Sequence, residues 1–373
     1  MFPALLAKVL QQVDTVKRSI ETTDEARNLL AGPEEIPELA SLRAKAPTTT
    51  EWRIYDHCAA LTRLYAIYER FVEEVIADLL STLPSLFKYA ELPNSFHEEH
   101  RFGVAHVLQQ VGKTIPKYRS LSAEEIVKDY YEAVSGTAAN YRISPLIMLR
   151  SEQNLRMNIL EMLFNRIGVD GMHQWLARHR FIDNFIQQIR GNQNTVEAEL
   201  TSFIQDRNEA AHGEVVNVLG KEALLEYCAF VNALCEALYE RVNHWLLTRR
   251  LEIGTARDIG EVTEVFKENI SVAIVHNITV AIGSSLHFMG DRYAYGATID
   301  NIQIQDVDQR QVVVSDNQEI GLKTSVPVKL GARVVTLELD ANPKALLQEP
   351  RRRLFVVDRN GIATEFQIQA STP

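Results

Sequence analysis

Residues 200–213 read LTSFIQDRNEAAHG and indicate both the kind of fold and a candidate site. Gly213 lies where a helix through this stretch is expected to end. Near that end are Arg207, whose guanidinium matches a phosphate, and His212, whose imidazole takes or gives a proton near neutral pH. Together the two residue types suit cleavage of a phosphodiester without a metal ion. The apolar residues at helical spacing are Leu200, Phe203 and Ile204.

The same helical spacing is found over most of the first 250 residues. The longest example runs from Trp52 to Leu80, and Pro84 is expected to stop it. Ser122, with Glu125 three residues later, is typical of a capping box that opens another helix. These patterns predict an all-helical bundle. Further helices are indicated by an apolar stripe that ends at Gly168 and by another from about Lys221 to about Arg250.

The period of the apolar residues changes near residue 266. We expect a helical domain over residues 1–254, with its core at about 50–250, followed by a small all-β barrel or sandwich over residues 266–373. From Gly254 to Phe266 neither period is clear. Alternating runs between Gly, Asp and Asn turns predict strands at 270–275, 298–304, 311–314, 333–339, 354–357 and 364–368.

Composition limits the classes of function. The 373 residues have a formal net charge of -10, which argues against a chain that coats nucleic acid or anionic lipid along its whole length. Any RNA contact is therefore expected to be local. The N-terminus lacks a signal-peptide pattern and no apolar run has membrane-spanning length, so we expect a cytoplasmic protein without membrane contact. Buried thiols in a reducing compartment are expected at Cys58, Cys228 and Cys235.

The spacing between the arginine and the histidine is not specific by itself. What distinguishes Arg207 and His212 is context, because a polar Asn208 follows the Arg and Gly213 closes the helix. On such a helix the Arg and the His flank a cleft without touching. The competing interpretation is a helix end whose basic residue is favoured by the helix dipole. Comparable spacings occur in Arg101 with His106 and in Arg166 with His173.

This pattern resembles the signature of the HEPN superfamily, all-helical nucleases and nucleotide-binding proteins whose motif is Arg, four to six residues and His, often with a polar residue after the Arg. Residues 68–74, YERFVEE, and 165–169, NRIGV, are similar to the RiboL-PSP-type branch. The resemblance covers about residues 50 to 250. It implies catalytic roles for Arg207, Asn208 and His212, and a homodimer that pairs two motifs.

The resemblance also implies a mechanism, in which the RNA 2′-hydroxyl attacks the adjacent phosphorus and leaves a 2′,3′-cyclic phosphate. No metal or cofactor is expected, and DNA should not be cut because it lacks that hydroxyl. The expected role is that of a toxin or phage-defence effector restrained by an antitoxin or another regulatory partner. The alternative is a non-catalytic HEPN-like protein that binds RNA or nucleotides, or scaffolds a complex.

The strand-rich part resembles another family. Residues 295–303 and 319–334 are similar to the second-domain β-barrel of translation GTPases, through an Ile-Gly-Leu-Lys, Pro-Val-Lys, Gly, Arg-Val rhythm. This resemblance implies a barrel that contacts RNA and makes tRNA the first substrate to test. A generic barrel without a nucleic-acid role is the alternative.

Two further groups of polar residues carry weaker signals. Residues 97–100, His-Glu-Glu-His, are dense in metal-ligand types but lack the histidine spacing of a zinc-protease helix, so a solvated stretch is expected there. Basic clusters suit either an RNA backbone or a solvated surface. They lie at Arg178-His179-Arg180, Arg249-Arg250 and Arg351-Arg352-Arg353.

Overall fold

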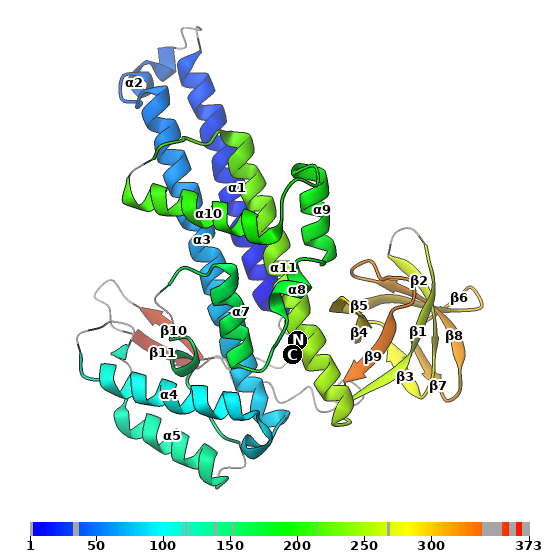
Figure 1. The fold of residues 1–373 in the computed structure, drawn as a ribbon. Helices are drawn as coiled ribbons and strands as arrows, with labels where there is room; N and C mark the ends of the chain where they lie inside the picture. Colours follow the sequence, from blue (N-terminus) through cyan, green and yellow to red (C-terminus); the bar gives the residue numbers. More distant parts are fainter. Residues whose placement is uncertain are drawn as a thin grey trace. The chain divides into compact units, whose positions relative to one another are not determined.

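The chain forms two compact units, which are both drawn in the ribbon of Figure 1. One comprises Met1–Ile253 with Met289–Tyr295 and holds the helices, and the other comprises Gly254–Phe288 with Gly296–Pro373. The computed structural model describes residues 3–32, 37–113, 115, 118–119, 121–137, 140–150, 153–213, 215–266 and 269–337, and the backbone of 353–357 and 363–367.

Three long helices form the frame of the helical unit. Each packs against the other two, and Figure 1 shows them side by side. They are α1 (Pro3–Ala31), α3 (Thr49–Thr82) and α11 (Lys221–Glu252). The helices predicted over Trp52–Leu80 and from Lys221 are therefore confirmed. Thr48 caps α3 in a reciprocal capping box with Glu51, and Pro84 lies in the turn that follows the helix.

Shorter helices cover this frame. In Figure 1, α10 (Val196–His212) lies across α3, which it contacts. α9 (Arg180–Ile189) packs on α11, and α4 (Asn94–Gln110) packs with α5 (Ala123–Ser135) and α6 (Pro145–Met148). The remaining helices and 3-10 turns are η1 (Pro37–Leu39), α2 (Ala40–Arg43), η2 (Leu83–Ser85), η3 (Tyr89–Glu91), α7 (Met157–Arg166) and α8 (Met172–Leu176).

The predicted capping box at Ser122 forms only in part. The Ser122 hydroxyl oxygen accepts the Glu125 backbone N–H at 3.3 Å and so caps α5. The hydroxyl proton goes to the Glu124 carboxylate at 2.6 Å, and no bond from Glu125 back to the cap is found among the described contacts. At the other expected helix end, Gly213 follows α10 with φ 75°, a left-handed conformation that favours glycine.

The strands of the second unit close into a barrel. Within the described residues, six strands form a ring in the order β4-β9-β1-β2-β8-β5 and back to β4, while β6 extends the sheet beside β5. Two-stranded pairs are formed by β3 with β7 and by β10 with β11. The bounds are β1 (Ala256–Val265), β2 (Ile270–Val275), β3 (Ile278–Ala281), β4 (Ser285–Gly290), β5 (Tyr293–Ile304), β6 (Val307–Gln309), β7 (Gln311–Val314), β8 (Gln318–Thr324), β9 (Arg333–Leu337), β10 (Arg353–Val357) and β11 (Ala363–Gln367).

The barrel begins earlier than the sequence pattern predicted. Its first strand starts at Ala256, whereas the pattern placed the start at Phe266. The stretch without a clear period is β1, which pairs with β2 on one side and β9 on the other. Its register shifts between Asp258 and Gly260 and again between Val262 and Glu264. Its buried residues lie three apart, at 256, 259 and 262, instead of two apart, and the first shift falls among them.

The strands that were predicted are all present. Residues 270–275 and 311–314 match β2 and β7, and 298–304 is the second part of the longer β5. β9, β10 and β11 confirm the strands predicted at 333–339, 354–357 and 364–368. Residues 338–339 and 368 of those predictions lie outside the described residues.

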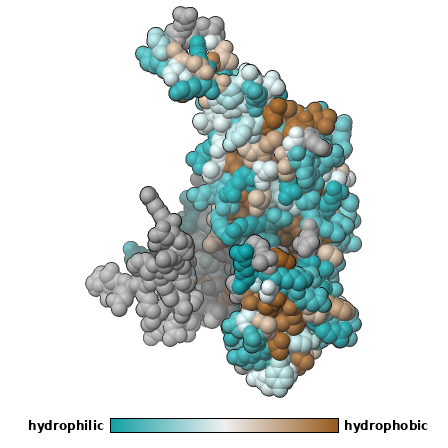
Figure 2. Space-filling model, turned by 90° about the vertical axis from the view of Figure 1, so that its left-hand side faces the viewer, coloured by the Kyte–Doolittle hydropathy of each residue, from teal (hydrophilic) through white to brown (hydrophobic). Residues whose placement is uncertain are grey.

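The surface is mixed in character. On the face shown in Figure 2, apolar patches are separated by hydrophilic surface. In the part of the chain that the structure describes, no helix is long and apolar enough to cross a membrane. All three cysteines are free thiols, with Cys228 and Cys235 buried and Cys58 half-buried.

The close packing of α4 on α6 gives a test of the helical unit. A Cβ at Gly103 would overlap the carbonyl oxygen and Cγ2 of the buried Ile147, so the backbone of α4 or α6 would have to shift. We expect Gly103→Ala to lower the free energy of unfolding by about 1–3 kcal/mol, measured by chemical denaturation. Gly296→Ala is the control, because its new methyl meets the His287 ring at an ordinary 3.6 Å. Unchanged stability in Gly103→Ala would contradict the close approach.

Candidate functional site

The motif helix α10 is fixed to the core by its apolar face. Thr195 caps its first turn by accepting the Ala198 N–H at 3.2 Å. Phe203 is fully buried and contacts aromatic rings of two helices. Tyr65 on α3 lies at a centroid distance of 6.3 Å, and Tyr227 and Phe230 on α11 lie at 5.2 and 6.3 Å. These contacts determine which way the end of the helix faces.

Two polar contacts hold the end of α10 and the segment after it. The Tyr227 hydroxyl donates to Asp206 Oδ2 at 2.6 Å, and burial raises the pKa of Tyr227, which keeps it a donor. The Leu219 N–H donates to Nδ1 of the buried His57 on α3 at 3.1 Å. Burial lowers the pKa of His57 more than Asp206 and Glu209 raise it, so the ring is neutral and able to accept.

The Arg207 guanidinium is the point at which three segments meet. Its Cζ lies 3.9 Å from the centroid of the Tyr65 ring. Its Nη1 donates to Asn208 Oδ1 at 2.9 Å and to Asn154 Oδ1 at 3.1 Å. Asn154 Nδ2 donates in turn to Asn208 Oδ1 at 3.1 Å. The motif helix, α3 and the loop before α7 therefore fix one cationic side chain.

Tyr65 is itself immobilised in the core, where it is 1% exposed. Its hydroxyl accepts the Leu155 N–H at 3.0 Å and donates to Glu69 Oε1 at 3.2 Å. Burial, the largest cause, raises the pKa of Tyr65 to about 12, so the ring stays neutral at physiological pH. A neutral ring attracts a cation through its π face. Tyr65 therefore orients Arg207 without cancelling its charge.

Arg207 is half-buried and has no acidic partner among the described residues. No carboxylate oxygen of the described residues lies within 4.0 Å of it, whereas Arg166, Arg180 and Arg190 each contact a glutamate. Its partners are two neutral amides, and its Nε and Nη2 donate to none of the residues that the structure describes. Arg207 thus presents positive charge and free N–H groups, which is what binding of a phosphate requires.

His212 lies apart from this cluster. It is the last residue of α10, is exposed, and makes no hydrogen bond with a described residue. It lies five positions after Arg207, which corresponds on a helix to a rise of about 7.5 Å and a turn of about 140°. One chain therefore brings Arg207 and Asn208 together but does not direct His212 to the same point.

Sequence reasoning missed Asn154 and the contact made by Tyr65. Asn154 precedes Arg207 by 53 residues and belongs to a loop, where no periodic pattern marks a functional side chain. Tyr65 has the spacing of an ordinary core residue of α3, and it is one. Its second role depends on which side chain lies over its ring, and spacing gives no information about that.

The competing Arg and His pairs are engaged elsewhere. Arg166 contacts Glu99 at 3.0 Å, while His173 lies 3.8 Å from Glu197 on α10. The exposed Arg101 lies over the neighbouring Phe102 ring. Neither arginine is held by neutral groups in the way that Arg207 is.

The other polar groups that the sequence suggested have structural partners. Within residues 97–100, His100 is buried and Glu99 contacts Arg150 and Arg166, which corrects the expectation of a solvated stretch. Among the described residues, no three His, Cys, Asp or Glu side chains lie together in a group that could hold a metal ion.

The basic clusters are also partly neutralised. His179 is fully buried and, together with Arg180, contacts Glu240 on α11. Arg249 contacts Glu91 and Glu252 at 3.8 and 3.2 Å. These contacts argue against binding of an RNA backbone by the clusters at 178–180 and 249–250. The side chains of 351–353 lie outside the described residues.

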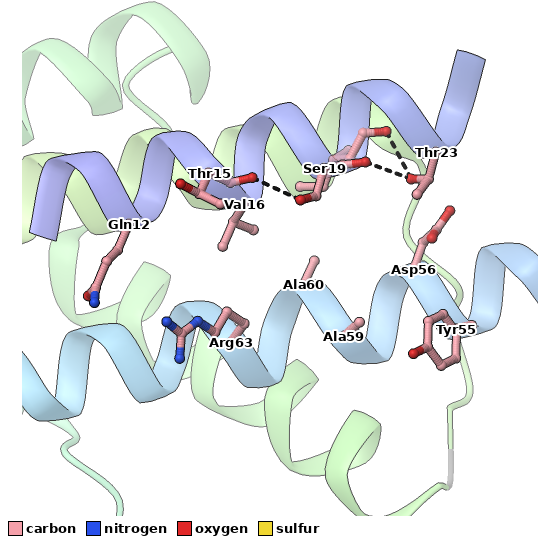
Figure 3. A pocket seen from close by; sticks show the side chains of 11 residues that line it. Gln12, Thr15, Val16, Ser19, Thr23, Tyr55, Asp56, Ala59, Ala60 and Arg63 are labelled. Carbon is pink, nitrogen blue, oxygen red and sulfur yellow. Dashed lines mark hydrogen bonds between the residues drawn. The ribbon is translucent and has the colours of Figure 1, made fainter. Parts of the chain in front are cut away.

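A groove of about 440 Å³ lies between α1 and α3 (Figure 3). Neither Arg207 nor His212 is part of its lining. Small and apolar side chains such as Val16 and Ala60 line it. The hydroxyls of Ser19 and Thr23 donate to carbonyls of their own helix, and Asp56 is held by Arg27 at 2.8 Å. The groove therefore offers no converging reactive groups.

Comparison with known families agrees with the motif. The family model described as RiboL-PSP-HEPN matches residues 34–244. This chain belongs to the RiboL-PSP-HEPN family. The match includes α10 with its motif and the α3 and Asn154 segments that hold Arg207. Membership of the RiboL-PSP-HEPN family indicates a role in RNA cleavage or RNA binding.

Solved structures match the RiboL-PSP-HEPN protein over about a fifth of its length. Two of them are of the C-terminal domain of a Geobacillus thermoleovorans protein described as a U32 peptidase, one as its selenomethionine variant. Their identities are 16% and 17%, with TM-scores of 0.19 and 0.20, and they cover 21% and 22% of this chain and 96% and 91% of the other. No curated protein matches the sequence. The likeness of the barrel to translation GTPases stays a prediction.

The hydrogen bond between Tyr227 and Asp206 provides a test of how the motif helix is anchored. Tyr227→Phe leaves the Asp206 carboxylate without its donor, so we expect a loss of about 1.5–3 kcal/mol in the free energy of unfolding. Tyr131→Phe is the matched control, because Tyr131 is 64% exposed. Equal stability of the two variants in urea denaturation would rule out this anchor.

Proposed function

We propose that this protein is a metal-independent endoribonuclease that works as a homodimer. The observation that carries the proposal is the uncompensated charge of Arg207, held between the Tyr65 ring and two amides. A structural arginine at a helix end is ordinarily paired with a carboxylate or fully solvated. Holding a cation in place by neutral groups leaves its charge available for an anionic ligand.

In the proposed reaction, the 2′-hydroxyl oxygen of RNA attacks the adjacent phosphorus and the bond to the 5′-oxygen breaks. His212 takes the proton from the 2′-hydroxyl or gives one to the leaving oxygen. Arg207 holds the phosphate through its free Nε and Nη2 groups, and Asn208 orients the guanidinium. The products are a 2′,3′-cyclic phosphate and a 5′-hydroxyl. DNA has no 2′-hydroxyl and is not cut.

The magnitudes suit these roles. A positioned proton-transfer group such as His212 contributes about 10²–10⁴-fold in rate. A donor aimed at charge that develops in the transition state contributes about 3 kcal/mol, which is the role given to Arg207. Asn154 positions the guanidinium and does not touch the substrate, so its loss is expected to cost less than that of Arg207.

A second candidate function is binding of RNA or nucleotides without cleavage. It is favoured by the exposed position of His212, because no described residue of the same chain fixes its tautomer or its orientation. A catalytic histidine is ordinarily oriented by a second group. In the first proposal, the partner protomer or the substrate supplies that group.

The biological role that we propose is that of a toxin or phage-defence effector. A nuclease that requires neither metal nor cofactor cannot be inactivated by withholding one, so its host needs an antitoxin or another regulatory partner to restrain it. The β-barrel selects the RNA in this proposal, and its resemblance to translation-factor barrels makes tRNA the first substrate to test.

The chemistry is tested by incubating the purified protein with tRNA and with an unstructured RNA in EDTA. We expect cleavage to cyclic-phosphate ends, and we expect Arg207→Ala and His212→Ala to lower the rate at least about 10²-fold. Asn154→Ala should retain more activity than Arg207→Ala. His106→Ala and His173→Ala are controls that keep wild-type activity. Binding of RNA without cleavage by the wild type would favour the second candidate.

The dimer is tested by mixing two inactive variants. Because Arg207 and His212 of one chain face different directions, we propose that the site combines groups from two chains. Co-expressed Arg207→Ala and His212→Ala protomers should then recover a measurable part of the activity that neither homodimer has. Full activity of a monomer in light scattering coupled to size exclusion, or inactive mixtures of well-folded variants, would contradict a shared site.

A further inference from the structure

A largely enclosed cavity of about 190 Å³ lies between α4, α5 and the start of α6, on residues with no part in the proposed cleavage. Its volume is below the roughly 300–1,000 Å³ of pockets for drug-sized ligands, so it suits one small ring system. Apolar residues, among them Ile126 and Ile147, form part of the lining. Its polar lining includes His100, Asp129, Arg142 and Ser144.

His100 is the buried polar group of this cavity, at 1% exposure. Its Nδ1 lies 2.9 Å from the Tyr89 hydroxyl, and its Nε2 has no partner among the described residues. Burial, aided by His97, lowers the pKa of His100 to about 4, so the ring is neutral at pH 7. The pKa of Tyr89 is raised to about 12, which keeps its hydroxyl a donor to Nδ1. We therefore place the ring proton on Nε2, and the ring itself lines the cavity.

The charged groups of the cavity are weakly engaged. Arg142 Nε lies 4.0 Å from Asp129 Oδ1, and the two side chains are 77% and 29% exposed. Such an ion pair contributes little to stability, so both groups are available to a ligand. Ser144 precedes α6 without capping it, and its hydroxyl has no hydrogen-bond partner among the described residues. With Glu125 and Asp129 against one guanidinium, the lining disfavours an anion.

A ligand for this cavity is uncharged and flat, donates hydrogen bonds to a carboxylate and accepts them from a guanidinium and an imidazole N–H. We infer that the cavity binds a guanine base. Guanine has two adjacent N–H donors on one edge, which match the two oxygens of Asp129, and acceptors at O6 and N7, which match Arg142 and His100. The Tyr130 ring, perpendicular to His100 at a centroid distance of 5.1 Å, and the isoleucines supply apolar contact.

The other bases fit less well. Adenine lacks the pair of adjacent donors and the O6 acceptor, while cytosine and uracil offer a smaller ring and one donor site each on that edge. A phosphate stays outside, because two carboxylates line the cavity. The same guanine chemistry occurs in a free nucleotide and in an RNA, and competition experiments distinguish the two sources.

The test is calorimetric titration of the full-length protein with guanosine, adenosine, cytidine and uridine at pH 7. We expect guanosine to bind about tenfold or more tightly than the others, and Asp129→Asn to weaken guanosine binding by a similar factor. Glu132→Gln is the matched control, because Glu132 lies on the same helix, pairs with Lys128 and is not part of the lining. Arg142→Gln, at a mostly exposed position, is a second variant if Asp129→Asn melts early.

Binding is measured here without reference to cleavage, so Arg207→Ala protein should bind guanosine as the wild type does. An RNA octamer with one guanine that displaces guanosine, while its adenine counterpart does not, assigns the cavity to RNA. Displacement by guanosine monophosphate alone assigns it to a free nucleotide. Equal affinity for all four nucleosides, no heat with any at millimolar concentration, or an unchanged affinity in folded Asp129→Asn and Arg142→Gln would overturn the inference.

Discussion

The stacking of Arg207 on Tyr65 is the interaction on which the candidate site depends. A half-buried guanidinium needs a partner, and a carboxylate would both fix it and cancel its charge. The neutral ring and the two amide oxygens fix it and leave the charge in place. Arg180 shows the other solution, since Glu240 holds it with His179 in the interior. The difference between these two environments separates an arginine that stabilises the fold from one that can bind an anion.

The rest of the helical unit serves this contact. Burial of Tyr65 in α3 keeps its hydroxyl protonated and immobilises its ring, and Phe203 packs α10 against the same ring. The loop that carries Asn154 is tied down through the neighbouring Leu155, whose N–H and carbonyl bond to Tyr65 and Tyr68. A change in the core near these tyrosines therefore acts on the site without touching it.

The sequence predicts those parts of the fold that repeat at a fixed period. The long helices α3 and α11 have unbroken apolar faces, so the spacing of their apolar residues reveals them. The end of α10 is predictable because Gly213 adopts the left-handed conformation that favours glycine. β1 escaped detection because its buried residues lie three apart, around a register shift, and do not alternate. Asn154 escaped because contacts between distant segments have no local signature. Periodicity thus finds elements, while the site required the tertiary structure.

The packing of the first helix on the last one has a consequence for synthesis. α1 lies against α11, which begins only at Lys221, so the three-helix frame cannot close before α11 has been made. Contacts this distant in sequence form slowly, and they require that α11 has left the ribosome. A nascent chain that has exposed the motif of α10 still lacks the aromatic side chains of α11 beneath it. For a protein that we propose to cut RNA, assembly of the site is thereby delayed until α11 has been made.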